Sequence, residues 1–350
     1  MNRNMTKLNI GVVFGGASPE HEVSRASALN IFTYLSPEKY NIIPIYISRE
    51  GNWFLYDGSL NKLPENIEKY SAGVTLGKQG MLRIVGEKVK IITLDLAFSV
   101  IHGKTGEDGT IQGLFEMCGL PYVGCGVSAS AICMDKTKAD LIAKSLDIPT
   151  VPSIVIHQGD PIEEIVKDIR GSLGYPCFIK PASGGSSVGA AKAKNKKEII
   201  EAIENALNFD HKVIIQKFIK CRELECSVIG AGDNIEVSLP GEITTPEEFY
   251  SYDAKYNNPE SKNIIPANVD EKIADQARDY ALRLFKAVEG SGLARVDFFL
   301  EQKTDKLIFN EINTMPGFTN ISMYPQLVMH MGYTPQAMLD RLVEIAIFKP

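Results

Sequence analysis

The sequence predicts a mixed α/β and α+β protein of two or three domains, with an open parallel sheet in its N-terminal domain. Its 350 residues exceed the size at which one hydrophobic core keeps growing. Near the N-terminus, apolar strands lead into glycine-rich turns and then into helical segments, which is how parallel α/β units begin. Near the C-terminus, two apolar runs flank a short polar turn and predict an antiparallel hairpin.

The first α/β unit begins with a buried-type strand at residues 8–14, followed by two glycines and a helix expected over 22–35. The same order recurs where an apolar strand at 94–101 leads through a glycine-rich turn to a helix expected over 110–118. Residues 51–85 predict only loops and short strands. Open α/β sheets bind ligands at the carboxyl ends of their strands, so we expect both glycine-rich turns to border a binding site.

Residues 124–129, G-C-G-V-S-A, match the dinucleotide-binding pattern G-x-G-x-x-A, which is weak on its own. No acidic residue ends a following strand at the expected place, because residues 135–146 have a helical pattern. We therefore favour a packing turn over a nicotinamide site. The pattern G-x-x-x-x-G-K-[ST] does not occur, so a common P-loop is excluded.

A lysine lies near the end of an apolar strand at residues 175–181, which follows a linker-like segment at 147–152. A buried Lys180 is costly unless it is paired, and a phosphate is a natural partner for it. The following residues, 182–189, are rich in Gly and Ser, and their backbone N–H and hydroxyl groups suit a phosphate cover. Taken alone, this loop is also compatible with an ordinary hairpin turn.

The C-terminal hairpin combines charges that suit a metal ion. Side chains alternate along a strand, so Arg295 and Asp297 share one face, and so do Glu311 and Asn313. Pairing the strands brings together a cation, two carboxylates and an amide oxygen, and Mg²⁺ prefers such oxygen ligands together with waters and phosphates. The turn at 315–317 leaves backbone N–H groups beside the carboxylates as a possible anion site. The alternative is a surface hairpin whose charges face solvent.

Composition narrows the class of partner. A net charge of −6 argues against nucleic acid or an anionic membrane as the main partner. No run of about 18 apolar residues occurs, so we expect no membrane-spanning segment. The six cysteines form no C-x-x-C pair, and we expect reduced thiols in a cytoplasmic protein.

Residues 242–256 are polar and aromatic, include Lys255 and Tyr256, and predict a loop that serves as a recognition surface or a lid. Lys180, the glycine–serine loop, Glu223 and the charged hairpin together describe a nucleoside triphosphate site without a P-loop. If a carboxylate receives the phosphoryl group, the product is an acyl phosphate, and the site must exclude water.

Several spaced motifs resemble those of the ATP-grasp ligases: Lys136, Lys180-Pro181 with Gly184-Gly185-Ser186-Ser187, residues 216–223, Arg295-x-Asp297 and Glu311-x-Asn313. Within that superfamily the chain resembles D-alanine–D-alanine ligases, through Phe14-Gly15-Gly16, Glu20-x-Glu22-Val23-Ser24, His102-Gly103, Gly106-Glu107-Asp108-Gly109, Met134-Asp135-Lys136 and Asn313-Thr314-x-Pro316-Gly317. The resemblance covers nearly the whole chain. It implies a three-domain ATP-grasp architecture, with an N-terminal α/β substrate domain at 1–130, a central subdomain at 131–215 and a C-terminal subdomain with the metal site at 216–350.

The resemblance also implies roles for individual residues. ATP would be bound by Lys136, Lys180, Ser186, Gln216, Lys217, Ile219, Glu223 and Lys255. Two Mg²⁺ or Mn²⁺ ions would be bound by Asp297, Glu311 and Asn313. The catalytic set would be Glu20, Ser186, Tyr256, Arg295 and Gly317, and the substrates would contact Glu20, His102, Ser322 and Met323.

The implied reaction is the ATP-dependent joining of two D-alanines through a D-alanyl phosphate, with release of ADP and phosphate, for peptidoglycan precursor synthesis in the cytoplasm. A homodimer is also expected. Gln216 replaces the glutamate that often lies beside adenine, which affects the expected ATP affinity, and Met323 replaces the usual leucine of the acceptor pocket at nearly equal volume. Two alternatives stay open: a resistance-type ligase that accepts D-serine or D-lactate, and an ATP-binding regulatory module that never turns over.

Overall fold

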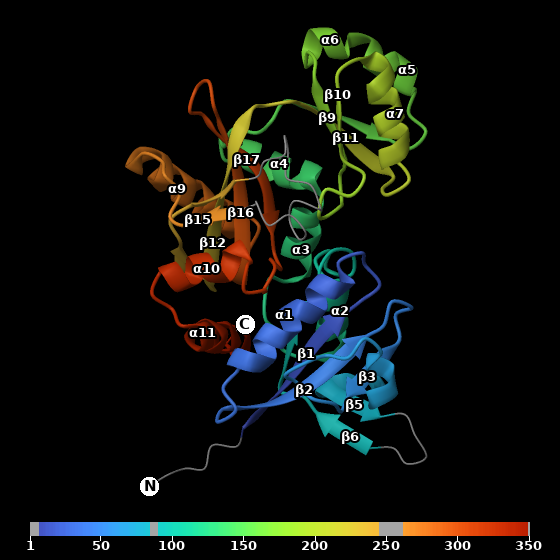
Figure 1. Cartoon of the computed structure of the whole chain (residues 1–350), viewed down its shortest axis with the longest axis vertical. Helices are drawn as coiled ribbons and strands as arrows, with labels where there is room; N and C mark the ends of the chain where they lie inside the picture. The colour runs from blue at the N-terminus through green and yellow to red at the C-terminus, as the bar shows by residue number, and fades with distance from the viewer. Residues whose placement is uncertain (1–6, 85–89, 245–261, 349–350) are drawn as a thin grey trace.

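The computed structural model describes residues 7–84, 90–244 and 262–348. These residues form three β-sheets with helices packed against them (Figure 1). The N-terminal sheet lies at one end of the long axis, the sheet that contains β9 and β11 lies at the other, and the C-terminal sheet lies between them on one side.

The N-terminal sheet has the strand order β6-β5-β4-β3-β2-β1-β7. Its strands and short 3₁₀ helices are β1 (Leu8–Gly15), β2 (Tyr40–Ile47), β3 (Trp53–Tyr56), η1 (Ile67–Tyr70), β4 (Ser71–Leu76), η2 (Lys78–Gly80), β5 (Met81–Ile84), β6 (Lys90–Thr93) and β7 (Leu96–Ser99). β1 pairs in parallel with β2 and β7, whereas β3 to β6 extend the sheet in antiparallel pairs. The predicted parallel sheet is confirmed at its centre, and the stretch predicted as loops and short strands forms its antiparallel edge.

Helices follow the glycine-rich turns after β1 and β7, as the sequence predicted. α1 (His21–Tyr34) follows β1, and α2 (Thr110–Cys118) follows the turn after β7, while α3 (Val127–Met134) and α4 (Lys136–Ser145) lead to the second sheet. Gly124 has φ +105, and a Cβ there would lie 3.3 Å from the Met315 side chain. A Cβ on Gly292 would come within 3.0 Å of the Gly124 backbone. This close packing supports the packing turn predicted for residues 124–129.

The second sheet has the antiparallel order β10-β9-β11-β8. Its elements are β8 (Ser153–His157), α5 (Ile162–Ile165), η3 (Val166–Asp168), α6 (Ile169–Ser172), β9 (Cys177–Pro181), β10 (Ala191–Ala193), α7 (Lys196–Ala206) and β11 (Lys212–Lys217). The Asn195 side chain accepts the N–H of Glu198 and caps the start of α7. Ile199 and Ile203 of α7 are fully buried in one cluster with Ile179 and Ile215 of the sheet, which fixes the strand that carries Lys180.

The C-terminal sheet has the order β15-β14-β12-β16-β17, and β13 pairs with β12. Its elements are β12 (Cys221–Ala231), β13 (Asn234–Val237), β14 (Gly241–Thr244), β15 (Lys262–Ile264), α9 (Glu271–Ala287), β16 (Gly292–Glu301), β17 (Leu307–Asn313), α10 (Met323–His330) and α11 (Pro335–Ile347). The predicted hairpin is confirmed: Arg295 lies opposite Asn313, and Asp297 opposite Glu311.

The loop predicted over 242–256 begins later than expected. Residues 242–244 belong to β14, which pairs with β12 and β15, so the prediction was wrong for these three. Arg222 donates to both carboxylate oxygens of Glu242, at 2.7 and 2.6 Å. This ion pair stabilises Glu242 within the strand, a position that composition alone does not favour for a charged residue. The remainder of the loop lies outside the described residues.

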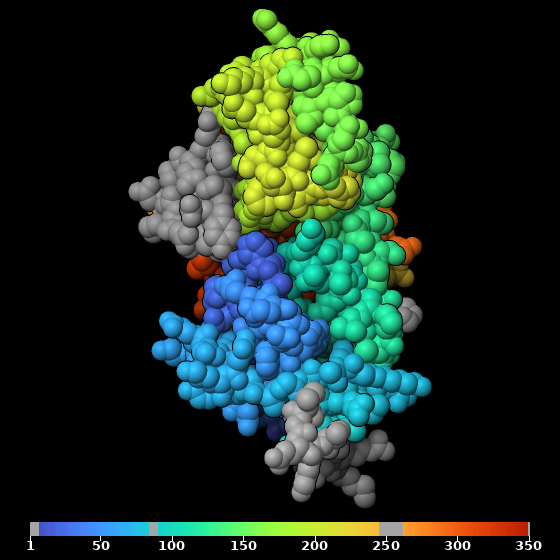
Figure 2. Space-filling model, turned by 90° about the vertical axis from the view of Figure 1, so that its right-hand side faces the viewer, coloured from blue at the N-terminus to red at the C-terminus, as the bar shows by residue number. Residues whose placement is uncertain are grey.

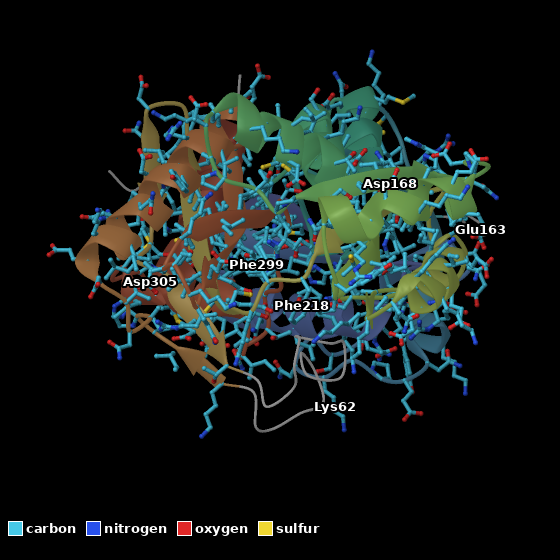
Figure 3. The ribbon with its side chains drawn as sticks, turned by 90° about the horizontal axis from the view of Figure 1, so that it is seen from above. Lys62, Glu163, Asp168, Phe218, Phe299 and Asp305 are labelled. Atoms are coloured by element: carbon cyan, nitrogen blue, oxygen red, sulfur yellow. The ribbon has the colours of Figure 1, made fainter. Side chains whose placement is uncertain are left out.

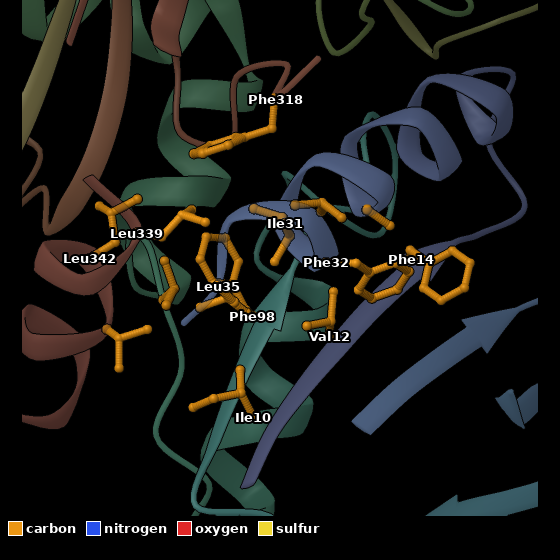
Figure 4. Close-up of a cluster of buried hydrophobic side chains, with 14 of the residues drawn as sticks. Ile10, Val12, Phe14, Ile31, Phe32, Leu35, Phe98, Phe318, Leu339 and Leu342 are labelled. Carbon is orange, nitrogen blue, oxygen red and sulfur yellow. The ribbon is translucent and has the colours of Figure 1, made fainter. Parts of the chain in front are cut away.

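One hydrophobic cluster joins the two ends of the chain. It contains Phe14 of β1, Ile31 of α1 and Phe98 of β7, together with Phe318 and Leu342 of the C-terminal region. Figure 4 shows the C-terminal side chains beside α1 and β7. The N-terminal domain and the C-terminal sheet are therefore packed against each other through a shared core.

The lobe formed by β9, β11 and α7 lies directly above the start of α1 in the space-filling view (Figure 2). The contact is made by the loop at 182–189, because Ser186 donates a hydrogen bond to Glu20. Within the described residues, no helix is both long and apolar enough to cross a membrane.

Candidate functional site

A cleft opens between the second sheet and the C-terminal sheet and has a volume of about 1040 Å³ when its open, solvent-filled mouth is included. Phe218 and Phe299 line it, and both lie near the middle of the molecule when it is seen from above (Figure 3). Of the residues predicted to bind ATP, the structure brings these to the cleft: Lys136, Lys180, Ser186, Gln216, Lys217, Ile219 and Glu223. Lys255 lies outside the described residues. The cleft thus offers apolar walls for a flat ring and lysines for an anion.

Lys180 reaches the cleft from β9 and is only 9% exposed. Burial, and secondly the charge of Lys136, lowers its pKa to about 8. Its Nζ lies 3.4 Å from Oδ1 of Asn310, a long contact for a buried ammonium. The charges of Glu311, Asp140 and Glu223 offset only part of the lowering of its pKa, so a phosphate is a favourable further partner for this buried cation.

Lys136 stands at the start of α4 and faces the same space. Its Nζ donates to the carbonyl oxygen of Gly184 at 2.7 Å and lies 3.1 Å from Glu311 Oε2. Asp135 caps this helix by accepting the N–H of Thr137. The helix start, the glycine–serine loop and β17 are therefore tied together at one point.

The charged face of the hairpin is a compact network. Arg295 donates to both carboxylate oxygens of Asp297, at 2.8 and 2.7 Å, and lies 3.0 Å from Glu225. Burial opposes the charge of Arg295, but Asp297 and Glu225 outweigh it and raise the pKa of the guanidinium well above its ordinary value. The cation is therefore kept charged and aimed by two carboxylates.

The donor set on this face fits Mg²⁺ or Mn²⁺. Asp297 and Glu311 supply two carboxylates from opposite positions of the hairpin. Asn313 donates from Nδ2 to Asp297 at 3.0 Å, so its amide nitrogen, and not its oxygen, faces this carboxylate. Among the described residues, no three His, Cys, Asp or Glu side chains form a metal cluster by themselves. One or two carboxylates completed by phosphate oxygens is the usual arrangement for Mg²⁺.

A second cavity of about 830 Å³ adjoins the first and shares Ser186, Glu225 and Glu311 with it. The structure brings the remaining described substrate and catalytic residues to its walls, together with the predicted metal ligand Asn313: Glu20, His102, Arg295, Gly317, Ser322 and Met323. Tyr256 lies outside the described residues. The first cavity suits a nucleotide and the second a small polar substrate. Glu225 and Glu311 line both cavities, and Arg295 of the second cavity contacts Glu225.

The loop at 182–189 closes over this junction in a strained conformation. Ser186 and Ser187 have φ values of 51 and 57, which non-glycine residues rarely adopt. Ser186 Oγ donates to Glu20 Oε1 at 2.5 Å. The carboxylate of Glu20 therefore faces the second cavity with one oxygen already bound.

His102 is buried between the two halves of the site. Its Nδ1 lies 3.2 Å from the carbonyl oxygen of Met315 and 3.5 Å from Glu107, and its Nε2 lies 2.9 Å from Ser27 Oγ. Burial lowers its basicity, but the hydrogen bond and charge of Glu107 outweigh burial and raise the pKa of His102. His102 therefore holds the start of the turn at 315–317 through the Met315 carbonyl.

The acceptor side of the second cavity lies at the start of α10. Ser322 Oγ accepts the N–H of Thr319 at 3.1 Å, and Met323 is buried against Ile243 and Leu327. A Cβ on Gly317 would lie 2.8 Å from Ser322 Oγ, so a larger residue there would displace the Ser322 hydroxyl. This geometry leaves a short backbone segment exposed to a substrate.

Sequence reasoning missed Asn310, Glu225 and Asn263 as wall residues. Asn310 follows Phe309 on β17, and regular alternation would place it on the core side. A register shift between Asp297 and Phe298 places Asn310 in the nucleotide cleft beside Glu311. Glu225 was detectable, because it shares a strand face with Glu223. Asn263 gave no signal, since it lies after the predicted loop.

Two antiparallel sheets that close on a lysine-lined cleft, with a carboxylate hairpin at its inner end, define the ATP-grasp class of fold. The family model described as D-ala D-ala ligase N-terminus matches residues 9–125, and the one described as D-ala D-ala ligase C-terminus matches residues 142–344. The chain belongs to the D-alanine–D-alanine ligase family.

Individual relatives agree with this assignment. The chain is 43% identical to the D-alanine–D-alanine ligase of Caldicellulosiruptor bescii, over 99% of this chain and 96% of that protein. It is 42% identical to that of Acetivibrio thermocellus, over 97% of this chain and 96% of that protein. Among solved structures, the D-alanine–D-alanine ligase from Coxiella burnetii matches with a TM-score of 0.87 and 34% identity, over 97% of this chain and 94% of that one.

A solved ligase of a different acceptor class is equally similar in fold. The VanG D-Ala:D-Ser ligase from Enterococcus faecalis matches with a TM-score of 0.88 and 37% identity, over 97% of this chain and 100% of that one. The fold therefore does not distinguish between acceptors.

Proposed function

We infer that this enzyme joins two D-alanines to D-alanyl-D-alanine at the expense of ATP, for peptidoglycan precursor synthesis. The carboxylate of the first D-alanine attacks the γ-phosphorus, and ADP leaves. The amine of the second D-alanine then attacks the carbonyl carbon of the acyl phosphate, loses a proton, and phosphate leaves. The observation that carries this proposal is the meeting of a lysine-lined cleft and a polar substrate cavity at Glu225 and Glu311.

The lysines of the first cleft hold the nucleotide. Lys136 and Lys180 bind its phosphates, Gln216 to Ile219 border adenine, and Glu223 binds the ribose. Lys180 is suited to this because its buried ammonium has lost most of its hydrating water. A phosphate supplies the hydrogen-bond acceptors that this water would provide. We further propose that Lys255 contacts the transferred phosphoryl group, although it lies outside the described residues.

The walls of the second cavity hold the reacting amino acids. Glu20 binds the ammonium of the first D-alanine, with Ser186 fixing its carboxylate and Tyr256 expected to join them. His102 borders this substrate, and Ser322 and Met323 border the acceptor. Arg295 and the Gly317 N–H bind the oxyanion of the tetrahedral intermediate, a contribution of about 10²- to 10³-fold in comparable sites.

Asp297, Glu311 and Asn313 would hold two Mg²⁺ or Mn²⁺ ions. When bound, these cations neutralise the charge of the transferring phosphoryl group. Lys136 and Arg295 already neutralise Glu311 and Asp297 in the structure. We also propose three domains bounded at 1–130, 131–215 and 216–350, a homodimer and a cytoplasmic location.

D-Alanine is proposed as the acceptor in preference to D-serine or D-lactate. Met323 is apolar, 4% exposed and packed against Leu327, so it suits a methyl group. An apolar pocket rejects an added hydroxyl by only about 10²-fold. Asn263 also lines the cavity and offers a polar group to such a hydroxyl. The similarity to a D-Ala:D-Ser ligase makes D-serine the competitor to test first.

Two assays test the proposed function. ADP release is measured with ATP and Mg²⁺, with and without D-alanine, and we expect release only with it. ATP binding without D-alanine-dependent ADP release would indicate a regulatory module instead. Competition between D-alanine and each other acceptor, with products separated by mass, should yield mainly D-alanyl-D-alanine at neutral pH. A dominant D-Ala–D-Ser or D-Ala–D-Lac product would refute the proposed acceptor.

A further inference from the structure

The turn that carries Gly317 is held by side chains of the N-terminal domain that the reaction above does not use. Ser27 and Asn30 lie three residues apart on α1 and so share one face of the helix. Ser27 Oγ accepts a hydrogen bond from the N–H of Phe318 at 3.2 Å. Asn30 Nδ2 donates to the carbonyl oxygen of Phe318 at 2.6 Å. Both backbone polar groups of one residue are therefore bound by α1.

Ser27 also connects this residue to the other end of the turn. Its Oγ lies 2.9 Å from His102 Nε2, while His102 Nδ1 lies 3.2 Å from the carbonyl oxygen of Met315. A carbonyl only accepts, so Nδ1 carries a proton. Nε2 accepts from the Ser27 hydroxyl when the ring is neutral and donates to Ser27 Oγ when the ring is charged, so the contact exists in both forms. The chain of contacts runs from Phe318 back to Met315, with Gly317 between two fixed ends.

The helix that makes these contacts is itself fixed to the sheet. Ser24 Oγ accepts the N–H of Gly15 at 2.9 Å and donates to the carbonyl oxygen of Val100 at 2.6 Å. The Phe318 ring packs edge-on against Phe98, with 5.9 Å between ring centroids (Figure 4). These contacts restrict the movement of the turn. In enzyme active sites, a displacement of about 1 Å can cost about 10²-fold in rate.

We propose that Ser27 and Asn30 are positioning residues for the acyl-transfer step: they set the Gly317 N–H relative to the first substrate. Glu20, which binds that substrate in the proposed function on which this inference rests, is the residue directly before the same helix. One rigid helix thus fixes the distance between the ammonium site and the oxyanion donor. Loss of either contact should slow attack on the acyl phosphate and leave nucleotide binding intact.

The test compares Ser27→Ala and Asn30→Asp with a control on the same helix. Asn30→Asp keeps the shape of a half-buried side chain but removes the donor to the Phe318 carbonyl. Thr33→Ala, on the exposed side of α1, removes a hydroxyl that donates to the Leu29 carbonyl oxygen within the same helix. For each variant, kcat, KM for ATP, ATP-binding stoichiometry and the number of ADP molecules released per dipeptide are measured.

We expect kcat to fall at least about tenfold in both variants, less than when an oxyanion donor itself is removed. KM for ATP and the binding stoichiometry should stay within about twofold, and ADP per dipeptide should rise above one, because the acyl phosphate hydrolyses while it waits. Thr33→Ala should match the unmodified enzyme. Unchanged kcat in both variants, or a loss matched by fewer ATP-binding molecules at one ADP per dipeptide, would refute the positioning role. An unmodified enzyme that makes no dipeptide would instead refute the proposed function, and this inference with it.

Discussion

At the scale of single residues, the site depends on two buried cations, Lys180 and Arg295, whose pKa values are set by burial and by neighbouring charges. Lys180 is buried and makes a long contact with Asn310, whereas Arg295 is held between two carboxylates. The first is therefore ready to bind an anion, and the second is fixed in place before any substrate arrives.

Removing Lys180 or Glu311 should lower turnover by at least about 10²-fold, because each acts on charge that develops during phosphoryl transfer. Folding should survive in Lys180→Ala and Glu311→Ala, since neither side chain belongs to the hydrophobic core. Lys167→Ala, an exposed lysine of the same lobe, serves as the control and should keep normal turnover. Normal turnover in either site variant would mean that the phosphate site lies elsewhere.

The affinity for ATP should fall above about pH 8. Burial lowers the pKa of Lys180 to about 8 in the free protein, while a bound phosphate favours the ammonium, so binding above that pH must take up a proton. Below it, this lysine adds no pH dependence. The same shift should make the ligand-free protein gain stability between about pH 8 and 10.5, since the unfolded chain then binds more protons.

Calorimetry of ATP binding at about pH 9, in two buffers of different ionisation enthalpy, measures the proton uptake directly. Lys180→Met should bind ATP more weakly and take up no proton at this site. Identical uptake by the unmodified protein and this variant would assign the titration to another group.

At the scale of elements, the loop at 182–189 bridges two domains through the bond from Ser186 to Glu20. Its positive φ values at Ser186 and Ser187 store strain that a bound phosphate can offset through the loop N–H groups. We expect amide hydrogen exchange of residues 183–189 to slow in the presence of ATP and a phosphinate analogue of the reaction intermediate. The exposed turn at 302–306 is the internal control. Equal exchange of 183–189 in both states would show that the loop does not respond to ligands.

Strand periodicity explains how much of this site could be predicted from the sequence. Alternation alone placed Arg295, Asp297, Glu311 and Asn313 on one face, and the hairpin register confirms it. Asn310 could not be predicted, because a one-residue irregularity reverses the face of a side chain and leaves no mark in composition. Ser27 and Asn30 contact Phe318 across separations of 291 and 288 positions, respectively, and no local sequence pattern predicts such contacts.

At the scale of the whole molecule, the domains are joined by a core that the N-terminal strands share with α11. Leu342→Ala should destabilise the protein by about 2–5 kcal/mol, because the side chain is fully buried in that core. Glu344→Ala, on the exposed side of α11, should change stability by less than about 0.5 kcal/mol. Urea unfolding followed at the single tryptophan, Trp53, measures both. An equally small effect of Leu342→Ala on the Trp53 signal would show that the N-terminal domain unfolds independently of α11.

The central claim is that the carboxylate of the first D-alanine is phosphorylated by ATP before the peptide bond forms. D-Alanine labelled with ¹⁸O in its carboxylate tests this directly, with the released phosphate and the dipeptide analysed by mass. The account predicts one ¹⁸O atom in each phosphate released with a dipeptide, since the acyl oxygen leaves with phosphorus. Phosphate without ¹⁸O, formed together with dipeptide, would contradict the acyl phosphate and the roles derived from it.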